Sequence, residues 1–281
     1  MSGSSVLYDV PGPRARARNL VLGVLAGIGL LGLLWYVYRS LDEANQFTAA
    51  MWDPFQYKAV QQKLADGLVA TLKAFATAAV LSLVFGALFA AGRLSDHKPV
   101  RAVCGAVVEF FRAMPLLIMI FALYQSLFTT SPFWGLVIGL TLYNGSVQAE
   151  IIRSGINAVP RGQGEAAYAL GLRKTQVMLT ILVPQAVRSM LPAIIGQLVV
   201  TLKDTSLGLI ITYPELLYVG KLIASNTATP DGYPYIPVTI IIGAIYIALC
   251  LLLTALAKRI EGRSRRGANR RTPTRRRAHA R

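Results

Sequence analysis

Residues 151–190 read IIRSGINAVPRGQGEAAYALGLRKTQVMLTILVPQAVRSM and join two long apolar stretches of the chain. Pro160 and Gly162 interrupt this segment near its start. The residues that follow, 165–172, have the composition of a short helix, and Glu165 falls in its first turn, where the helix dipole favours a negative charge. The segment is therefore more than a simple connector.

The second half of the segment predicts another short helix. Gly171 is placed to end or turn the first helix, and residues 174–183 have a helical pattern that stops at Pro184. Two short helices that meet at a sharp angle make a rigid knob. We expect residues 151–190 to fit a groove on another protein and to transmit motion.

The rest of the chain is rich in apolar residues. Of its 281 residues, 54% are hydrophobic and 15% are charged, whereas soluble domains carry about 25% charged residues. A helix needs about 20 mostly apolar residues to cross a bilayer. The apolar runs that approach or exceed this length are 20–38, 68–91, 103–128, 132–150, 191–212 and 236–257. They predict an all-α, polytopic membrane protein with about six transmembrane helices and no room for a fused ATPase.

The first run, 20–38, begins like a signal peptide because Arg14, Arg16 and Arg18 precede it. It is longer than the 7–15 apolar residues of a signal peptide, and no convincing cleavage site follows closely. We therefore interpret it as an uncleaved extra helix, which ends in an aromatic belt at 35–38.

Basic residues alternate between the two sides of this layout. Lys and Arg are in excess before residue 20, in the loop 92–102, in the segment 151–190 and in the C-terminal tail. The loops 39–67 and 213–235 carry more acidic than basic residues. By the positive-inside rule, residues 1–19, residues 151–190 and both termini are cytoplasmic.

The formal net charge of +16 is concentrated at the C-terminal end, where 11 of the 29 basic residues follow Leu256. Residues 259–281 lack apolar periodicity and are predicted to be disordered. We interpret them as a segment that fixes the topology by contact with anionic lipid headgroups. Nucleic acid is disfavoured as a partner because no aromatic residues interleave the charges.

Residues for catalysis or metal binding are not grouped in the sequence. There is no GxxxxGK[ST] phosphate loop, no nucleophile constellation and no cluster of metal ligands, and Cys104 and Cys250 stand singly within apolar runs. The chain is not predicted to be an enzyme or to hold a metal or cofactor. ATP would have to be bound by a partner subunit.

The spacing of Glu165-Ala166-Ala167, Gly171, Ile181 and Val183-Pro184 resembles the EAA motif of ABC importer permeases, although the family usually ends the motif with Leu-Pro. Further segments resemble the polar amino acid branch of that family, in the family's order: 109–117, 153–156, 162–165, 184–186 and 203–207. The resemblance covers residues 64–258 and implies the transmembrane domain of a type I ABC importer. The opening residues 6–13 resemble those of actinobacterial glutamate permeases.

The resemblance implies that the EAA helices couple the permease to its ATPase. Glu165 would contact the ATPase or cap its own helix, Ala166 and Ala167 would allow close approach, and Gly171 would permit the turn. Pro184 closes the motif. The implied partners are a cytoplasmic ABC ATPase dimer, an extracytoplasmic solute-binding protein and a second permease subunit, which is more readily a paralogue than a second copy.

Ionisable residues within membrane spans are costly, so they are functional candidates by default. Lys203 could neutralise a substrate carboxylate and Asp204 could bind an α-amino group, but a structural pairing across helices explains them equally well. For Asn144, structural hydrogen bonding is the alternative. The candidates for the solute path are Asn144, Lys203, Asp204, Thr205 and Ser206.

These features predict the permease subunit of an ATP-driven importer in the cell membrane, which moves a polar amino acid, glutamate in the first place, into the cytoplasm by alternating access. The alternative is a secondary transporter or channel that works without an ATPase. Such a protein would be expected to contain an internal inverted repeat, and it would have no evident use for the helical segment 151–190. A membrane-embedded enzyme would need catalytic groups clustered in the spans, where only Lys203 and Asp204 qualify.

Overall fold

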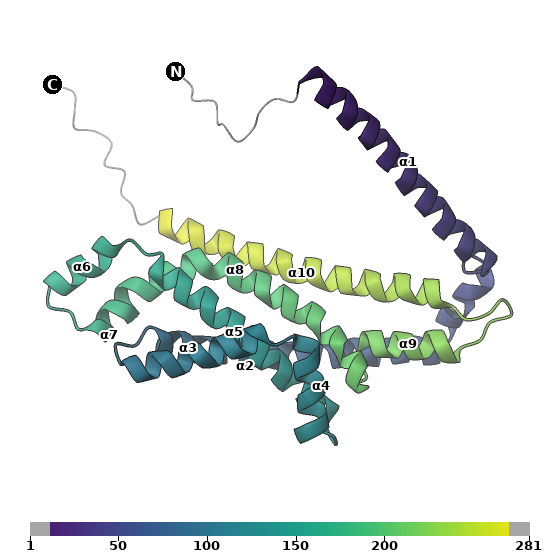
Figure 1. Ribbon diagram of the computed structural model, residues 1–281. Helices are drawn as coiled ribbons and strands as arrows, with labels where there is room; N and C mark the ends of the chain where they lie inside the picture. Colours follow the sequence, from purple (N-terminus) through teal and green to yellow (C-terminus); the bar gives the residue numbers. More distant parts are fainter. Residues whose placement is uncertain (1–11, 270–281) are drawn as a thin grey trace.

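The computed structural model describes residues 12–269, which are helical and include no β-strand (Figure 1). This confirms the all-α prediction. The elements in chain order are α1 (Pro13–Glu43), η1 (Ala49–Gln56), α2 (Lys58–Arg93), α3 (Lys98–Ala113), α4 (Leu116–Leu127), α5 (Pro132–Asn157), α6 (Arg161–Ala169), α7 (Lys174–Gln176), η2 (Val177–Leu182), α8 (Val183–Asp204), η3 (Thr205–Ile211), α9 (Leu216–Asn226) and α10 (Tyr235–Asn269).

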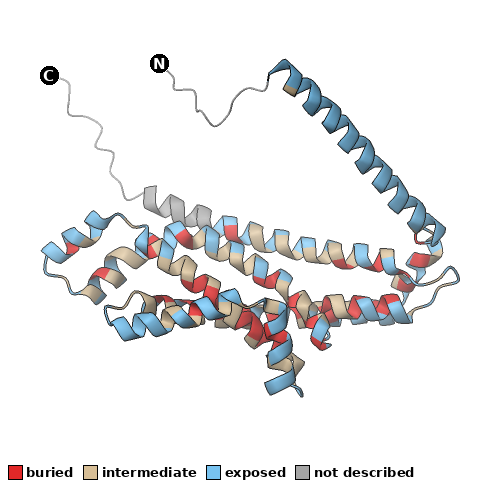
Figure 2. Cartoon of the chain, viewed as in Figure 1, coloured by how far each residue is buried: buried red, intermediate tan, exposed pale blue. Residues whose placement is uncertain are grey.

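The body of the molecule is built around α2 and α5; α3, α4, α8 and α9 pack against one or both of them, and α10 packs against α8 and α9. Buried residues gather where these helices meet (Figure 2). Small residues bring α2 and α5 close together, because a Cβ added at Gly86 would lie 2.7 Å from the Cβ of Gln148. The central cluster of the core includes Ala74, Ala78, Ile120, Leu136 and Leu140.

Helix α1 stands away from this body (Figure 1), and none of its residues is buried. The chain is tied to the body just after α1. There Gln46 donates to the Tyr233 carbonyl at 3.1 Å and accepts from the Ile236 amide at 3.1 Å. The rings of Tyr38 and Phe47 stack beside this point, 5.4 Å apart. A separate N-terminal helix is therefore present and begins at Pro13; that it is an extra transmembrane helix over 20–38 stays a prediction.

Four helical stretches of the described chain are long and apolar enough to cross a membrane: Pro13–Glu43, Lys58–Arg93, Lys174–Ile211 and Tyr235–Arg259. A fifth is formed by α3 and α4 if this bent pair counts as one span. The pair bends by 100°, so the run predicted at 103–128 is broken rather than continuous. The bend falls at Met114, because a residue before proline is driven out of the helical region. The count of six spans stays a prediction, since it also needs α5 to cross.

Pro184 does not stop a helix as predicted. The π-helical η2 runs directly into α8, and Pro184 lies in the first turn of α8. A missing amide donor is tolerated at that position.

The loop 213–235, in which the sequence predicts no span, contains the helix α9. Residues 259–269, expected to be disordered, continue α10, because extending an existing helix costs little. Residues 1–11 and 270–281 lie outside the described part.

Candidate solute path and coupling segment

A hydrogen-bonded cluster of polar side chains joins α5 to α8 inside the body. Asn144 is fully buried. Its Oδ1 accepts from Gln197 Nε2 at 2.6 Å, and its Nδ2 donates to Asp204 Oδ2 at 3.4 Å. The structure thus brings together two predicted path residues, Asn144 and Asp204, and adds Gln197, which the sequence analysis missed.

Helix α5 also carries two buried polar atoms without a hydrogen-bond partner in the described chain. They are the hydroxyl of Ser146 and the Oε1 of Gln148, although Gln148 Nε2 donates to the Ile194 carbonyl at 3.3 Å. Unpaired polar groups in an apolar interior are costly. Gln148 lies one turn after Asn144 on the same face of α5, so this face is suited to contact with water or a polar solute, whereas Ser146 points to another side of the helix.

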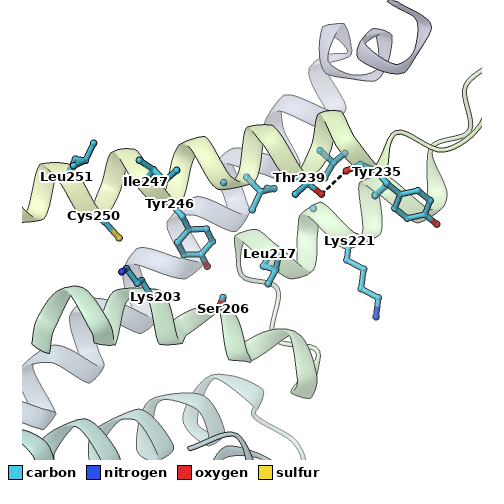
Figure 3. Close-up of a pocket in the computed structure, with 15 residues that line it drawn as sticks. Lys203, Ser206, Leu217, Lys221, Tyr235, Thr239, Tyr246, Ile247, Cys250 and Leu251 are labelled. Atoms are coloured by element: carbon cyan, nitrogen blue, oxygen red, sulfur yellow. Dashed lines mark hydrogen bonds between the residues drawn. The ribbon is translucent and has the colours of Figure 1, made fainter. Parts of the chain in front are cut away.

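Lys203 lies apart from this cluster. Its side chain is exposed and lines a groove of about 680 Å³ between α8, α9 and α10 (Figure 3). Ser206, Lys221 and Tyr246 line the same groove. Adjacent residues point about 100° apart on a helix, so Lys203 and Asp204 face different surroundings. Within the described residues Lys203 forms no salt bridge.

Thr205 is the remaining predicted path residue. Its side chain is buried and its hydroxyl donates to the Leu202 carbonyl at 2.7 Å. This bond lies within its own turn of helix, so the hydroxyl of Thr205 is already satisfied there.

Glu215 is a buried acid that the sequence analysis missed. Its carboxylate accepts from the amides of Leu217 and Tyr218, both at 2.7 Å, and from the Tyr246 hydroxyl at 2.8 Å. It caps α9, where the helix dipole favours a negative charge. An acidic residue between Pro214 and an apolar run was the signal that could have revealed it.

The predicted coupling segment projects from one end of the body as α6 and α7, near the described C-terminal end of α10 (Figure 1). Glu165 and Ala166 are exposed on α6, whereas Ala167 is buried. Gly171 has φ +78°, and its amide donates to the Tyr168 carbonyl at 2.9 Å. The left-handed conformation makes the turn between the helices, as expected of a glycine there.

Charged residues tie three helices together at this end. Glu150 of α5 pairs with Arg93 of α2 at 2.8 Å and with Arg153 at 2.5 Å. Glu109 of α3 pairs with Arg93 at 3.3 Å and with Arg112 at 3.5 Å. In the sequence these residues belong to the segment 109–117, whose pattern does not reveal the connection through Arg93 to α2 and α5.

A second ionic contact reaches the coupling segment itself. Lys174, the first residue of α7, donates to the carboxylate of Asp96 and, at 3.1 Å, to the carbonyl of Leu94. The hydrogen bond from Lys174 lowers the pKa of Asp96 below its ordinary value. The turn after α2 is therefore joined to the coupling segment.

Residues 82–266 match the model of a family described as the binding-protein-dependent transport system inner membrane component. The chain is 41% identical over 235 residues to the glutamate transport system permease protein GluD of Corynebacterium glutamicum, covering 81% of this chain and 84% of that protein. It is 33% identical over 206 residues to the probable glutamine ABC transporter permease protein GlnP of Bacillus subtilis, covering 70% and 92%. A crystal structure of an amino acid ABC transporter with histidines matches with a TM-score of 0.66 at 31% identity, covering 72% of this chain and 94% of that one.

Proposed function

Since this chain belongs to the family of binding-protein-dependent transport system inner membrane components, we propose that it is the permease subunit through which an ATP-driven importer moves glutamate into the cytoplasm. The chain is a multi-pass membrane protein with the fold of an ABC importer transmembrane domain. In this family ATP is hydrolysed by a separate subunit.

The observation that carries the proposal is the coupling segment. Glu165 and Ala166 are presented on the exposed face of a short helix, and Gly171 fixes the turn that follows. A rigid projection of this kind suits a groove on an ATPase, whose closure would push on the permease and rock its helices between outward-open and inward-open states. One chain supplies half of the path, and a paralogous permease supplies the other half.

The choice of glutamate is supported by the similarity to GluD and by the charges near the membrane interior. A cation in a spanning helix needs a counter-charge. Lys203 is exposed to the groove, so it is available to a carboxylate of an acidic solute. Asp204 and Asn144 bind the ammonium group or hold α5 and α8 together.

The orientation follows from the charges of the loops. The coupling segment and both termini face the cytoplasm, where basic residues are in excess. The loop that contains α9 then faces the solute-binding protein.

ATP-dependent uptake of labelled glutamate tests the proposal, in vesicles that hold this chain with its permease partner, its ATPase and its solute-binding protein. Lys203→Ala should lower uptake about tenfold or more, because a charge-assisted contact contributes about 1.5–3 kcal/mol. Lys203→Arg should retain part of the glutamate uptake, because it keeps the positive charge. Lys221→Ala is the matched control, since this lysine lines the same groove but lies on α9.

Three results would contradict parts of the proposal. Uptake of another amino acid but not of glutamate would overturn the substrate. Normal uptake by Lys203→Ala would overturn the role of this lysine. Uptake without an ATPase would favour the secondary transporter and overturn the importer.

A further inference from the structure

Lys174 lies in the spacer between Gly171 and Ile181, outside the residues of the motif itself. Its ammonium group contacts both the side chain of Asp96 and the backbone of Leu94. Leu94 is the C-cap of α2, and the last carbonyls of a helix lack intrahelical donors and attract cations. One side chain of the coupling segment thus binds two groups of the turn 94–97, which is 78 residues away in sequence from it.

Close packing does not fill the space beside this contact. A cavity of about 720 Å³ lies between the coupling segment and the cytoplasmic ends of α2 and α5, lined by Ala91, Ile152, Met178, Val183 and Met190 as well as by the pair itself. Methionine side chains adapt readily to changes in shape. The π-helical η2 is also part of this wall, and π-helical turns often mark functional sites. The coupling segment therefore has room to move against α2 and α5.

The turn 94–97 leads directly into the ionic cluster of the body. Arg93, the residue before it, pairs with Glu150 of α5 and Glu109 of α3. A displacement of the turn is thereby passed to α2, α3 and α5 together. The Lys174–Asp96 pair, the first contact in this series, is exposed: 39% of the Lys174 side chain and 79% of the Asp96 side chain are accessible. Exposed pairs add little to stability, so this one suits transmission better than a structural role.

We propose that the Lys174–Asp96 pair is a positioning contact through which the coupling segment moves the cytoplasmic ends of α2, α3 and α5 when the ATPase closes. The pair forms a second connection, beside the continuous helix from η2 into α8, between the ATPase and the helices of the solute path. This inference rests on the proposed function. It adds a requirement of its own: the pair sets how much solute moves for each ATP hydrolysed.

The test compares Lys174→Gln, Asp96→Asn and the charge-reversed double variant Lys174→Asp/Asp96→Lys in the reconstituted importer. ATP hydrolysis, glutamate uptake and co-purification with the ATPase are measured for each. The single variants should keep the ATPase bound and active but move several-fold less glutamate per ATP. The reversed pair should recover part of the loss, although not the contact to the Leu94 carbonyl. Lys98→Gln is the matched control, an exposed lysine on the same side that should behave as wild type.

Single variants with the wild-type ratio of uptake to hydrolysis would overturn the inference and leave the proposed function intact. So would a double variant no better than either single one. Loss of the ATPase from the single variants would make the pair part of the docking surface and would also overturn it. A wild-type complex without ATP-dependent uptake would overturn the proposed function, and this inference with it.

Discussion

At Gly171 one backbone angle sets the shape of the coupling segment. Its φ of +78° lies in the left-handed region, which costs other residues roughly 1–2 kcal/mol. A Cβ at this position would meet nothing within 4 Å. The need for glycine is therefore conformational and does not come from crowding, so a substitution tests the angle alone.

Gly171→Ala should lower the free energy of unfolding by about 1 kcal/mol and weaken ATPase binding, because alanine is strained in the left-handed conformation of this turn. Thermal unfolding and co-purification with the ATPase measure the two effects. Gly162→Ala is the control, since it lies in α6 with open space around it and no positive φ. Equal behaviour of the two variants would show that the turn does not need a left-handed residue.

The titration of Asp96 reports on its contact with Lys174. The hydrogen bond from Lys174 depresses the pKa of Asp96 in the folded state. The contact therefore stabilises the fold above the ordinary carboxyl pKa, and this contribution is lost as the pH falls through the folded-state value. Lys174→Met should raise the pKa of Asp96 in a carboxyl ¹³C NMR titration, whereas Lys98→Met should leave it in place. An unchanged pKa in Lys174→Met would mean that the contact does not form in solution.

Between elements, the closest approach of α2 and α5 depends on Gly86. A Cβ there would lie 2.7 Å from Gln148 Cβ and 3.1 Å from the amide nitrogen of Ala149. One is a backbone atom of α5 and the other is attached directly to its backbone, so neither can move unless the helix itself moves. The polar face of α5 near Asn144 and Gln148 is therefore placed by a contact between backbones.

Gly86→Ala should cost about 1–3 kcal/mol of stability, because α2 must move away from α5. It should also lower glutamate uptake, since Gln148 is displaced. Gly105→Ala is the control, because this glycine of α3 has open space around it and alanine favours a helix. Thermal unfolding in detergent and uptake in vesicles measure the effects. A wild-type melting temperature for Gly86→Ala would contradict the close approach.

The sequence predicts the presence of the long helices better than it predicts their ends and the contacts between them. The apolar runs predict the long helices, because burial in lipid demands length and hydropathy. Pro184 predicts a helix stop that the structure does not have, because a proline that ends one helix and a proline in the first turn of the next look alike in sequence. Helix α9 was missed because it is shorter than a span. The contact of Asn144 with Asp204 depends on the register of α5 against α8, which close packing sets and periodicity does not reveal.

At the scale of the whole molecule, α1 and the body are separate in their packing. No residue of α1 is buried (Figure 2), whereas Gln46 is 8% exposed and bonds to Tyr233 and Ile236. The chain is therefore anchored to the body after α1 and not by it. We predict that lipid or another subunit covers the apolar surface of α1.

Replacing residues 20–34 with an unrelated apolar helix of equal length should change the stability of the isolated chain by about 0.5 kcal/mol or less, because the body loses no packed side chain. Gln46→Ala should cost about 1–3 kcal/mol, since it leaves two backbone groups without their partner. Both are measured by thermal unfolding of the purified chain in detergent. If the replaced helix destabilises the chain as much as Gln46→Ala does, α1 packs against its own body. If it weakens only assembly with the second permease, the surface of α1 belongs to that interface.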